Sequence, residues 1–197
     1  MRIISGKLKG RRFSAPTSLP VHPTTDQAKE ALFNVLNHRF FFQDIRVLDL
    51  FFGLGGISYE FASRGVPSIH CVDIDHGCVR YVQETIRRFE ISDQIQVSRS
   101  DVFKFLKRNF SAPYDFIFAD PPYQMSDEHL KPLIDLCLQS EWIKSGGLMI
   151  LEHSHRKTLI YDHPYYKKTK RYGQVCFSFF ECFDQTDLPV YKTFDTK

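Results

Sequence analysis

Short apolar runs alternate with helical patterns over most of the chain after residue 45. The runs lack polar alternation, as is typical of strands that are buried on both faces of a parallel sheet. Expected strands cover residues 47–51, 68–72, 95–97, 116–119, 148–152, 167–169 and 175–183. Between them, apolar residues recur every three or four positions, which predicts helices over 56–62, 77–90, 102–108 and 127–139. This alternation predicts an α/β fold with a parallel sheet covered by helices.

The first 43 residues begin with a different pattern, that of a hairpin. Residues 2–5 and 11–13 are short strand-like runs on either side of a turn region that begins at Gly6 and ends at Gly10. A hairpin alone is only marginally stable in water, so we expect it to pack against the rest of the protein.

The helix after this hairpin is expected over residues 25–38, where apolar residues recur at helical spacing. Thr24 is the expected N-cap, because Gln27 three residues later completes a capping-box pattern. The chain therefore has three expected parts: a basic extension over 1–43, a main domain over 44–184 and a weakly periodic tail over 185–197.

The composition is that of a soluble globular protein. Of the 197 residues, 43% are hydrophobic and 25% are charged, which is ordinary for such domains. No apolar run is long enough to span a membrane, and the first residues lack the apolar core of a signal peptide. The 5 cysteines are odd in number and show no C-x-x-C spacing, which indicates reduced thiols and argues against a disulfide framework or a zinc site. We therefore expect a cytoplasmic protein with no metal and no membrane partner.

The net charge of +3 conceals two strongly basic segments. Residues 1–12 hold five basic side chains and no acid, and residues 156–172 hold six against one acid, so the remainder of the chain is acidic. This segregation indicates a polyanionic partner, although a single charged run is more often a solvated face. The side chains expected to hold phosphates, on one side of the domain, are Arg2, Lys7, Lys9, Arg11, Arg12, Lys167, Lys168, Lys170 and Arg171.

The strand expected over 116–119 runs directly into Asp120, Pro121, Pro122 and Tyr123. Open α/β sheets hold their ligands at the carboxyl ends of their strands, where this group falls. The Asp120 carboxylate and the Pro121 carbonyl are adjacent acceptors that match the two N–H donors of a planar exocyclic amine. Tyr123 offers a face on which a base can stack, so we assign these four residues to catalysis. The alternative is a plain exit from strand to turn, since Asp-Pro-Pro is also a common turn sequence.

A glycine loop after the first expected strand permits a ligand to approach the backbone, because Gly53 and Gly55 lack a Cβ. Asp73 lies 20 residues past Gly53, the spacing at which an acid meets ribose hydroxyls in dinucleotide folds. The phosphate-binding pattern G-x-G-x-x-G fails, because its third glycine is replaced by Ser58. The loop therefore suits a nucleoside better than a pyrophosphate.

Acids at other strand ends complete the expected cofactor pocket. Asp49 is suited to hold the ammonium group of an amino acid, and Asp101 to accept from an adenine amine. Asp75 is expected only to begin a helix. The residues assigned to the cofactor are Asp49, Phe51, Gly53, Gly55, Asp73, Ile74, Asp101, Val102 and Asp120.

These motifs resemble a known class of enzymes. Asp49-x-x-x-Gly53-x-Gly55, with Asp73, Asp101 and the stretch 120–123, is similar to class I S-adenosylmethionine-dependent methyltransferases that act on the amino groups of bases. Two further stretches, 2–11 and 23–34, resemble the bacterial 16S ribosomal RNA guanine-N2 methyltransferase family. The resemblance extends from residue 2 to about residue 183.

The resemblance implies a Rossmann-like sheet of seven strands, the last two forming an antiparallel hairpin. It implies S-adenosyl-L-methionine as cofactor and one guanine of 16S ribosomal RNA, free or in a small-subunit assembly intermediate, as substrate. We expect the protein to be a monomer. The residues themselves leave other functions open. These are an adenine-N6 DNA or RNA methyltransferase, a non-catalytic nucleic-acid-binding module, and a nicotinamide oxidoreductase, against which the missing third glycine argues.

The chain departs from the family pattern at four positions. His22 stands where the family usually has Arg, and Asp73 where it usually has Glu. Phe52 and Leu54 replace small residues of the glycine loop. We expect the change at His22 to weaken an RNA or structural contact, and the changes at Phe52 and Leu54 to alter the shape of the loop while leaving the fold unchanged.

Overall fold

The computed structural model describes residues 1–14, 19, 24–108, 112–139, 142–155 and 162–183. The predicted tail, His22 and the basic residues Arg156 and Lys157 lie outside the described residues. The strands are β1 (Arg46–Leu50), β2 (Ser68–Asp73), β3 (Ile95–Arg99), β4 (Tyr114–Ala119), β5 (Ile143–Ser154), β6 (Tyr166–Tyr172) and β7 (Val175–Glu181). The helices are α1 (Asp26–Leu36), the short 3-10 helix η1 (Phe42–Asp44), α2 (Gly56–Ser63), α3 (His76–Arg88), α4 (Val102–Leu106) and α5 (Asp127–Cys137). Within this described part, no helix has the length and apolar character needed to cross a bilayer.

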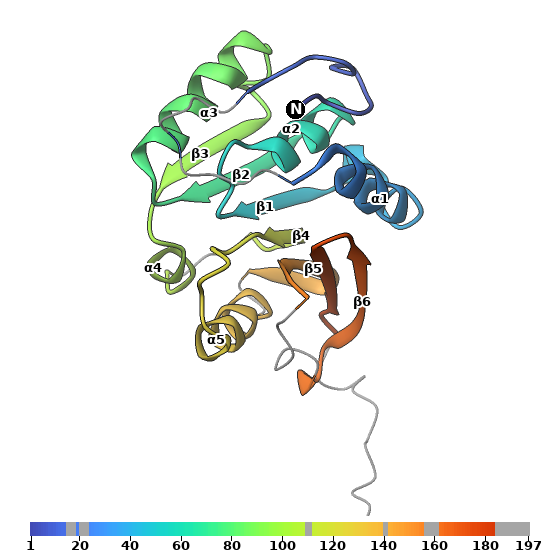
Figure 1. Cartoon of the computed structure of the whole chain (residues 1–197), viewed down its shortest axis with the longest axis vertical. Helices are drawn as coiled ribbons and strands as arrows, with labels where there is room; N and C mark the ends of the chain where they lie inside the picture. Colours follow the sequence, from blue (N-terminus) through green and yellow to red (C-terminus); the bar gives the residue numbers. More distant parts are fainter. Residues whose placement is uncertain (15–18, 20–23, 109–111, 140–141, 156–161, 184–197) are drawn as a thin grey trace, which may run out of the picture.

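One sheet runs through the molecule, with β3 at the top of Figure 1 and β6 at the lower right. The strand order is β3-β2-β1-β4-β5-β7-β6, and every pair is parallel except β5 with β7 and β7 with β6. The predicted seven-stranded sheet with an antiparallel final hairpin is confirmed. The order changes direction between β1 and β4, and such a reversal opens a crevice at the carboxyl ends of the two strands.

Helices cover both faces of the sheet, as predicted. α1, α2 and α3 pack on one face over strand residues such as Val47 and Phe116. α4 and α5 pack on the other face over residues such as Leu48 and Ile117. Because side chains alternate along a strand, Asp49 points to the same face as Val47, towards α2.

The start of α1 differs from the prediction. Thr25 is the N-cap, and its side-chain oxygen accepts from the backbone N–H of Ala28 at 3.2 Å. The hydroxyl of Thr24 instead donates to the Glu152 carboxylate on β5 at 2.8 Å. The prediction of Thr24 as N-cap is wrong, because a contact 128 residues away in the sequence takes its hydroxyl.

The N-terminal hairpin and the strand expected over 148–152 also differ in detail from the predictions. The hairpin has one β-bridge, between Arg2 and Arg12, and its two arms form no regular strands. β5 begins at Ile143, earlier than expected, because Ile143 pairs with Tyr114 across an irregularity in the register of β4.

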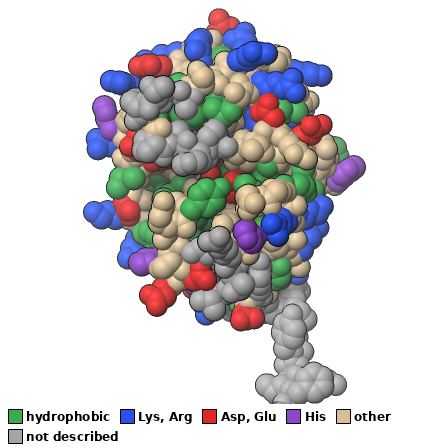
Figure 2. All heavy atoms as spheres, in the orientation of Figure 1, with side chains coloured by type: hydrophobic (Ala, Val, Ile, Leu, Met, Phe, Trp, Pro, Cys, Tyr) green, Lys and Arg blue, Asp and Glu red, His purple; other side chains and the backbone are tan. Residues whose placement is uncertain are grey.

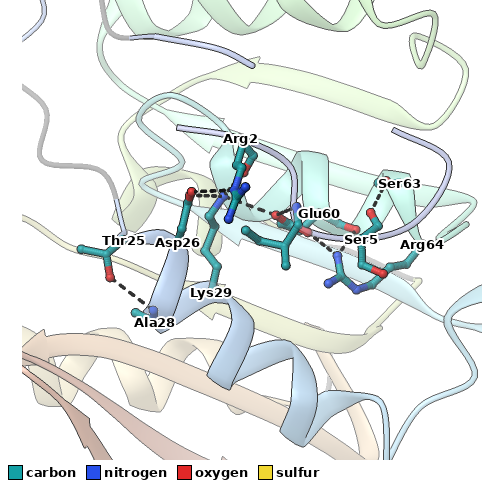
Figure 3. A network of polar contacts seen from close by, with 10 residues as sticks. Arg2, Ser5, Thr25, Asp26, Ala28, Lys29, Glu60, Ser63 and Arg64 are labelled. Carbon is teal, nitrogen blue, oxygen red and sulfur yellow. Dashed lines mark hydrogen bonds and ion pairs between the residues drawn. The ribbon is translucent and has the colours of Figure 1, made fainter. Parts of the chain in front are cut away.

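A buried ion pair fastens the N-terminal extension to α2 (Figure 3). The Lys29 ammonium on α1 donates to the Arg2 carbonyl at 2.6 Å and lies 3.3 Å from carboxylate oxygens of Glu60 and Asp26. Glu60 also accepts from the backbone N–H of Ile4 at 2.7 Å. The side chains of Lys29 and Glu60 are 1% and 0% exposed, and Glu60 also pairs with Arg64, so removing Lys29 or Glu60 would disrupt a buried network of charges.

The extension also shares the hydrophobic core of the sheet. Ile3 and Phe13 of the hairpin and Leu32 and Phe33 of α1 are buried in the same cluster as α2 and the strands. The described part of 1–43 is therefore packed as a layer of the fold. The domain boundary after residue 43 and the RNA-binding role of the extension stay predictions.

The two basic segments lie towards opposite edges of the sheet. The hairpin reaches the β3 edge, where Lys7 donates to the side chain of Gln94 and Arg11 donates to the Arg88 carbonyl. The second segment forms β6, which is the other edge strand. The two segments therefore belong to elements at the two ends of the strand order, although Phe13 of the hairpin and Tyr172 of β6 pack against the same hydrophobic cluster. That both segments lie on one side of the domain stays a prediction.

Gly6→Ala tests the close approach of the hairpin to α2. Gly6 has a φ of +84°, and a Cβ built there would lie 1.9 Å from the Ser63 carbonyl oxygen. We expect the substitution to lower the free energy of unfolding by about 2–3 kcal/mol, through left-handed strain and displacement of the hairpin. Gly10→Ala is the matched control, since Gly10 has a φ of +83° with nothing within 4 Å, and should cost about 1 kcal/mol. Urea unfolding measures both, and equal losses would show that contact with Ser63 is unimportant.

Candidate active site

A cavity of about 660 Å³ opens at the carboxyl ends of the central strands. Figure 2 shows acidic and hydrophobic side chains together around a hollow near the centre of one face. The volume lies in the usual range for small-molecule sites. All four residues predicted to be catalytic line this cavity: Asp120, Pro121, Pro122 and Tyr123. The predicted cofactor residues that line it are Asp49, Phe51, Gly53, Asp73, Ile74, Asp101 and Asp120.

Gly55 and Val102, which we also assigned to the cofactor, do not line the cavity. Gly55 is the N-cap of α2 with a φ of +75°, and a Cβ there would lie 2.9 Å from the Tyr59 ring. Val102 is buried on the opposite face of the sheet, in the core with α5. Gly55 therefore shapes the loop and the Val102 side chain supports α4, and the cofactor contacts assigned to both residues stay predictions.

The loop after β1 is held in an unusual backbone conformation. Phe51, a cavity-lining residue, has a φ of +60°, which is rare for a residue with a side chain. Its backbone N–H donates to the Val72 carbonyl at 2.9 Å. Strain of this kind costs on the order of 1–3 kcal/mol and persists mainly at functional sites. The loop thus directs the Phe51 ring and Gly53 to the cavity.

Asp49 lies at the inner end of the cavity and is 1% exposed. It accepts a hydrogen bond from the Ser58 hydroxyl of α2 at 2.5 Å. Burial raises the pKa of Asp49 to about 7, and the negative charge of Asp73 adds to this effect. A ligand cation placed here would stabilise the ionised carboxylate, as expected for a residue that holds an ammonium group.

Asp73 is fixed by the glycine loop itself. Its carboxylate accepts from the backbone N–H groups of Gly53 at 3.0 Å and Asp75 at 2.9 Å. Burial raises the pKa of Asp73, while these hydrogen bonds lower it. Each carboxylate oxygen has a second lone pair, so both oxygens can still accept from the two hydroxyls of a ribose.

The acids after β2 and β3 also begin helices. Asp75 caps α3 by accepting from Cys78 N–H at 2.8 Å, as predicted, and Asp101 caps α4 by accepting from Lys104 N–H at 2.9 Å. Both also line the cavity. The adenine contact assigned to Asp101 stays a prediction.

The Asp-Pro-Pro-Tyr stretch leaves β4 and turns across the cavity. The Asp120 N–H donates to the Leu50 carbonyl at 3.2 Å, which extends the β1–β4 pairing by one residue, and Met125 N–H donates to the Pro122 carbonyl at 2.8 Å. Tyr123 is 43% exposed, and burial of its hydroxyl end raises its pKa to about 12, so the ring is neutral. A partly exposed aromatic ring thus lies near the Asp120 carboxylate.

Several residues near the site were missed from the sequence. Glu152 is the last residue of the strand expected over 148–152, so the search for acids at strand ends that found Asp49, Asp73 and Asp101 would have found it too. Met1, Phe13, Thr24 and Lys29 of the extension line the cavity, and no local pattern places them there.

The charges of the cavity decide which kind of ligand fits. Lys29 is the one basic side chain in the described lining, and its ammonium already contacts Arg2, Asp26 and Glu60. A pyrophosphate would therefore face carboxylates without a free basic side chain to pair with. A nucleoside with a cationic amino-acid group fits the acids, the ribose acceptor Asp73 and the apolar side chains Phe51 and Ile74. Among the described residues, no cluster suited to a metal ion is found.

The strand order, the glycine loop after β1 and the acidic cavity define a Rossmann-like α/β protein of the methyltransferase class. A solved structure named "Putative methyltransferase yhhF from Escherichia coli" superposes with a TM-score of 0.80 at 24% identity, covering 93% of this chain and 98% of that one. The Thermus protein TTHA0928 superposes with a TM-score of 0.77 at 28% identity, covering 92% and 99%. These neighbours share the whole described architecture.

Sequence comparison places the chain in a family. The family model described as "Conserved hypothetical protein 95" matches residues 1–181, so the protein belongs to that family. The protein named "Putative rRNA methyltransferase YlbH" of Bacillus subtilis is 31% identical over 194 residues, 98% of each chain. "Ribosomal RNA small subunit methyltransferase D" of Escherichia coli K12 is 28% identical over 152 residues, 77% of this chain and 74% of that one.

Asp73→Ala tests the cofactor pocket. Two hydrogen bonds from a ribose to a charged acceptor would be removed, so we expect the affinity for S-adenosylmethionine to fall by about 2–4 kcal/mol. Calorimetry on the folded variant measures this, with Asp93→Ala, an exposed residue ahead of β3, as the control. Unchanged affinity in Asp73→Ala would exclude the pocket assignment, and tighter binding of NADH to the wild-type protein would favour an oxidoreductase.

Proposed function

We propose that this protein transfers a methyl group from S-adenosylmethionine to the exocyclic N2 amine of one guanine in bacterial 16S ribosomal RNA. The observation that carries the proposal is the stretch from Asp120 to Tyr123, which lines an acidic cavity beside the glycine loop. The names of relatives support the substrate class, since several are called ribosomal RNA small subunit methyltransferase D.

The residues of the cavity divide into two groups with different tasks. Asp49 holds the ammonium group of the cofactor, Asp73 holds its ribose, and Phe51 packs against its apolar part. When bound, S-adenosylmethionine supplies an electrophilic methyl group. The Asp120 carboxylate and the Pro121 carbonyl each accept a hydrogen bond from one N–H group of the amine and thereby turn the nitrogen lone pair out of the plane of the base.

Positioning supplies most of the catalysis in this scheme, because no covalent enzyme intermediate is needed. Tyr123 stacks on the target guanine and fixes its plane relative to Asp120. The guanine must leave its stack to reach the cavity, or already be looped out in the RNA.

The N-terminal extension is the proposed docking surface for RNA. The five basic side chains of residues 1–12 are all exposed, and Met1 and Phe13 of the same extension line the cavity. Among the described residues, no hydrogen bond or ion pair engages the side chain of Lys9 or Arg12, so their charges are available to phosphates. Asp26 pairs with Arg2 at 3.3 Å, and β6 supplies the second basic segment. We propose a monomer that acts in the cytoplasm on 16S RNA or on an assembling small subunit.

Incubation with labelled S-adenosylmethionine tests this function. The substrates are naked 16S RNA and small-subunit particles that lack the modification, and the product is identified as a modified nucleoside by mass spectrometry. N2-methylguanosine in one of these RNAs supports the proposal. N6-methyladenosine would transfer the assignment to the adenine class, and an absence of transfer to any RNA despite RNA binding would favour a non-catalytic binding module.

Asp120→Ala separates chemistry from binding. The acceptor is most valuable when positive charge develops on the amine nitrogen, so its loss should lower the single-turnover rate on the order of a hundredfold or more, with little change in RNA affinity. Asp120→Asn should be milder, because its amide oxygen still accepts. Transfer by Asp120→Ala at the wild-type rate would mean that the amine is held elsewhere.

Neutralising Lys9 and Arg12 tests the RNA surface. For each phosphate that the variant no longer binds, the slope of log affinity against log salt should fall by about 0.7–0.9, while the affinity for S-adenosylmethionine stays the same. Lys107→Gln with Lys131→Gln is the matched control, since these exposed residues belong to the α4 and α5 side of the sheet. An equal change in the control would show only a general effect of net charge.

A further inference from the structure

Glu152 is a buried acid that the proposed mechanism does not use. It is 1% exposed and lies on β5, which pairs in parallel with β4. The last paired residues of these strands are Ala119 and Leu151, so Asp120 and Glu152 are the next residues on the two neighbouring strands. Strands in a sheet lie about 4.8 Å apart, and residues at the same level point to the same face. The two carboxyl groups therefore lie side by side.

The groups around Glu152 keep its carboxylate negatively charged. Thr24 Oγ1 donates to Glu152 Oε2 at 2.8 Å, a hydrogen bond that favours the ionised carboxylate. Asp49 faces the pair from β1 and Tyr123 faces it from the loop after β4. Lys29 on α1 is engaged by Asp26, Glu60 and the Arg2 carbonyl, and Phe177 of β7 pairs with Glu152 in the strand register. No described cation neutralises the two carboxylates.

We propose that Glu152 is a positioning residue of methyl transfer: its carboxylate, held by Thr24 beside Asp120, makes Asp120 a strong enough base to take a proton from the amine. This inference rests on the proposed function. Burial raises the pKa of Asp120 well above its ordinary value, and the charge of Glu152 raises it further. Burial also raises the pKa of Glu152 to about 7.

The step balances without a further reactant. The amine lone pair forms the new N–C bond as the C–S bond breaks, and the sulfur keeps that electron pair and becomes a neutral thioether. The amine nitrogen then carries one positive charge, which it loses by giving one proton to the Asp120 carboxylate. That proton later leaves to solvent. An isolated carboxylate is a weak base near neutral pH. The negative charge of Glu152 makes Asp120 a stronger base and so aids the transfer of the proton from the amine to Asp120.

The test is the pH dependence of single-turnover transfer from about pH 5 to pH 9 in Glu152→Gln and in the wild type. Glutamine keeps an acceptor for Thr24 but removes the charge, so Asp120 should ionise at lower pH. We expect the acidic limb of the rate profile to move down by about one pH unit, and the plateau rate to fall on the order of tenfold. Glu84→Gln on α3, an exposed acid, is the control and should keep the wild-type profile.

Thr24 provides an independent variant. Thr24→Val removes the hydrogen bond that keeps Glu152 ionised, so the limb should move in the same direction by a smaller amount, and Thr24→Ser should restore it. A wild-type profile in folded Glu152→Gln, or reduced stability with an unmoved limb, would overturn the inference. If the wild type forms no N2-methylguanosine, the proposed function fails. If the wild type forms it and Glu152→Gln keeps the wild-type profile, only the role of Glu152 fails.

Discussion

Burial of several carboxylates without a free cation beside them is the constraint on which the site depends. Asp49, Asp73, Asp120 and Glu152 all come from the carboxyl ends of neighbouring parallel strands, and burial raises the pKa of each. Such an arrangement opposes folding, and the surrounding core must support it. The same property makes the cavity selective, because a cationic ligand relieves the repulsion and a pyrophosphate increases it. The sheet thus provides affinity for a cationic nucleoside by keeping its own charges unpaired.

The one basic side chain in the described lining of this cavity has a structural role. Lys29 joins the extension to Glu60, and Glu60 belongs to α2, the helix that starts at the glycine loop. The extension, the loop and the cavity wall are therefore parts of one packed body. A segment that we propose to contact RNA is in this way connected, through buried contacts, to the helix that shapes the cofactor pocket.

The position of the two basic segments limits the kind of partner that can contact both. The hairpin lies near the β3 edge, and β6 forms the other edge of the sheet. A polyanion in contact with both must extend across the molecule. A ribosomal RNA is long enough to do so, and a small acidic ligand is not. The sequence showed the two segments clearly but held no information on the distance between them.

The sequence by itself determined the order of the elements and most of the cavity. Apolar runs, glycines and strand-end acids are local signals, and parallel strands bring their carboxyl ends together whatever the helices do, which is why Asp49, Asp73, Asp101 and Asp120 meet as predicted. Only the tertiary structure decided that the Thr24 hydroxyl bonds to Glu152 while Thr25 caps the helix. It also decided that Gly55 and Val102 lie outside the cavity lining, and that Met1, Phe13 and Lys29 belong to it. Those outcomes depend on contacts between residues far apart in the chain, where burial and charge outweigh the local preference of each residue.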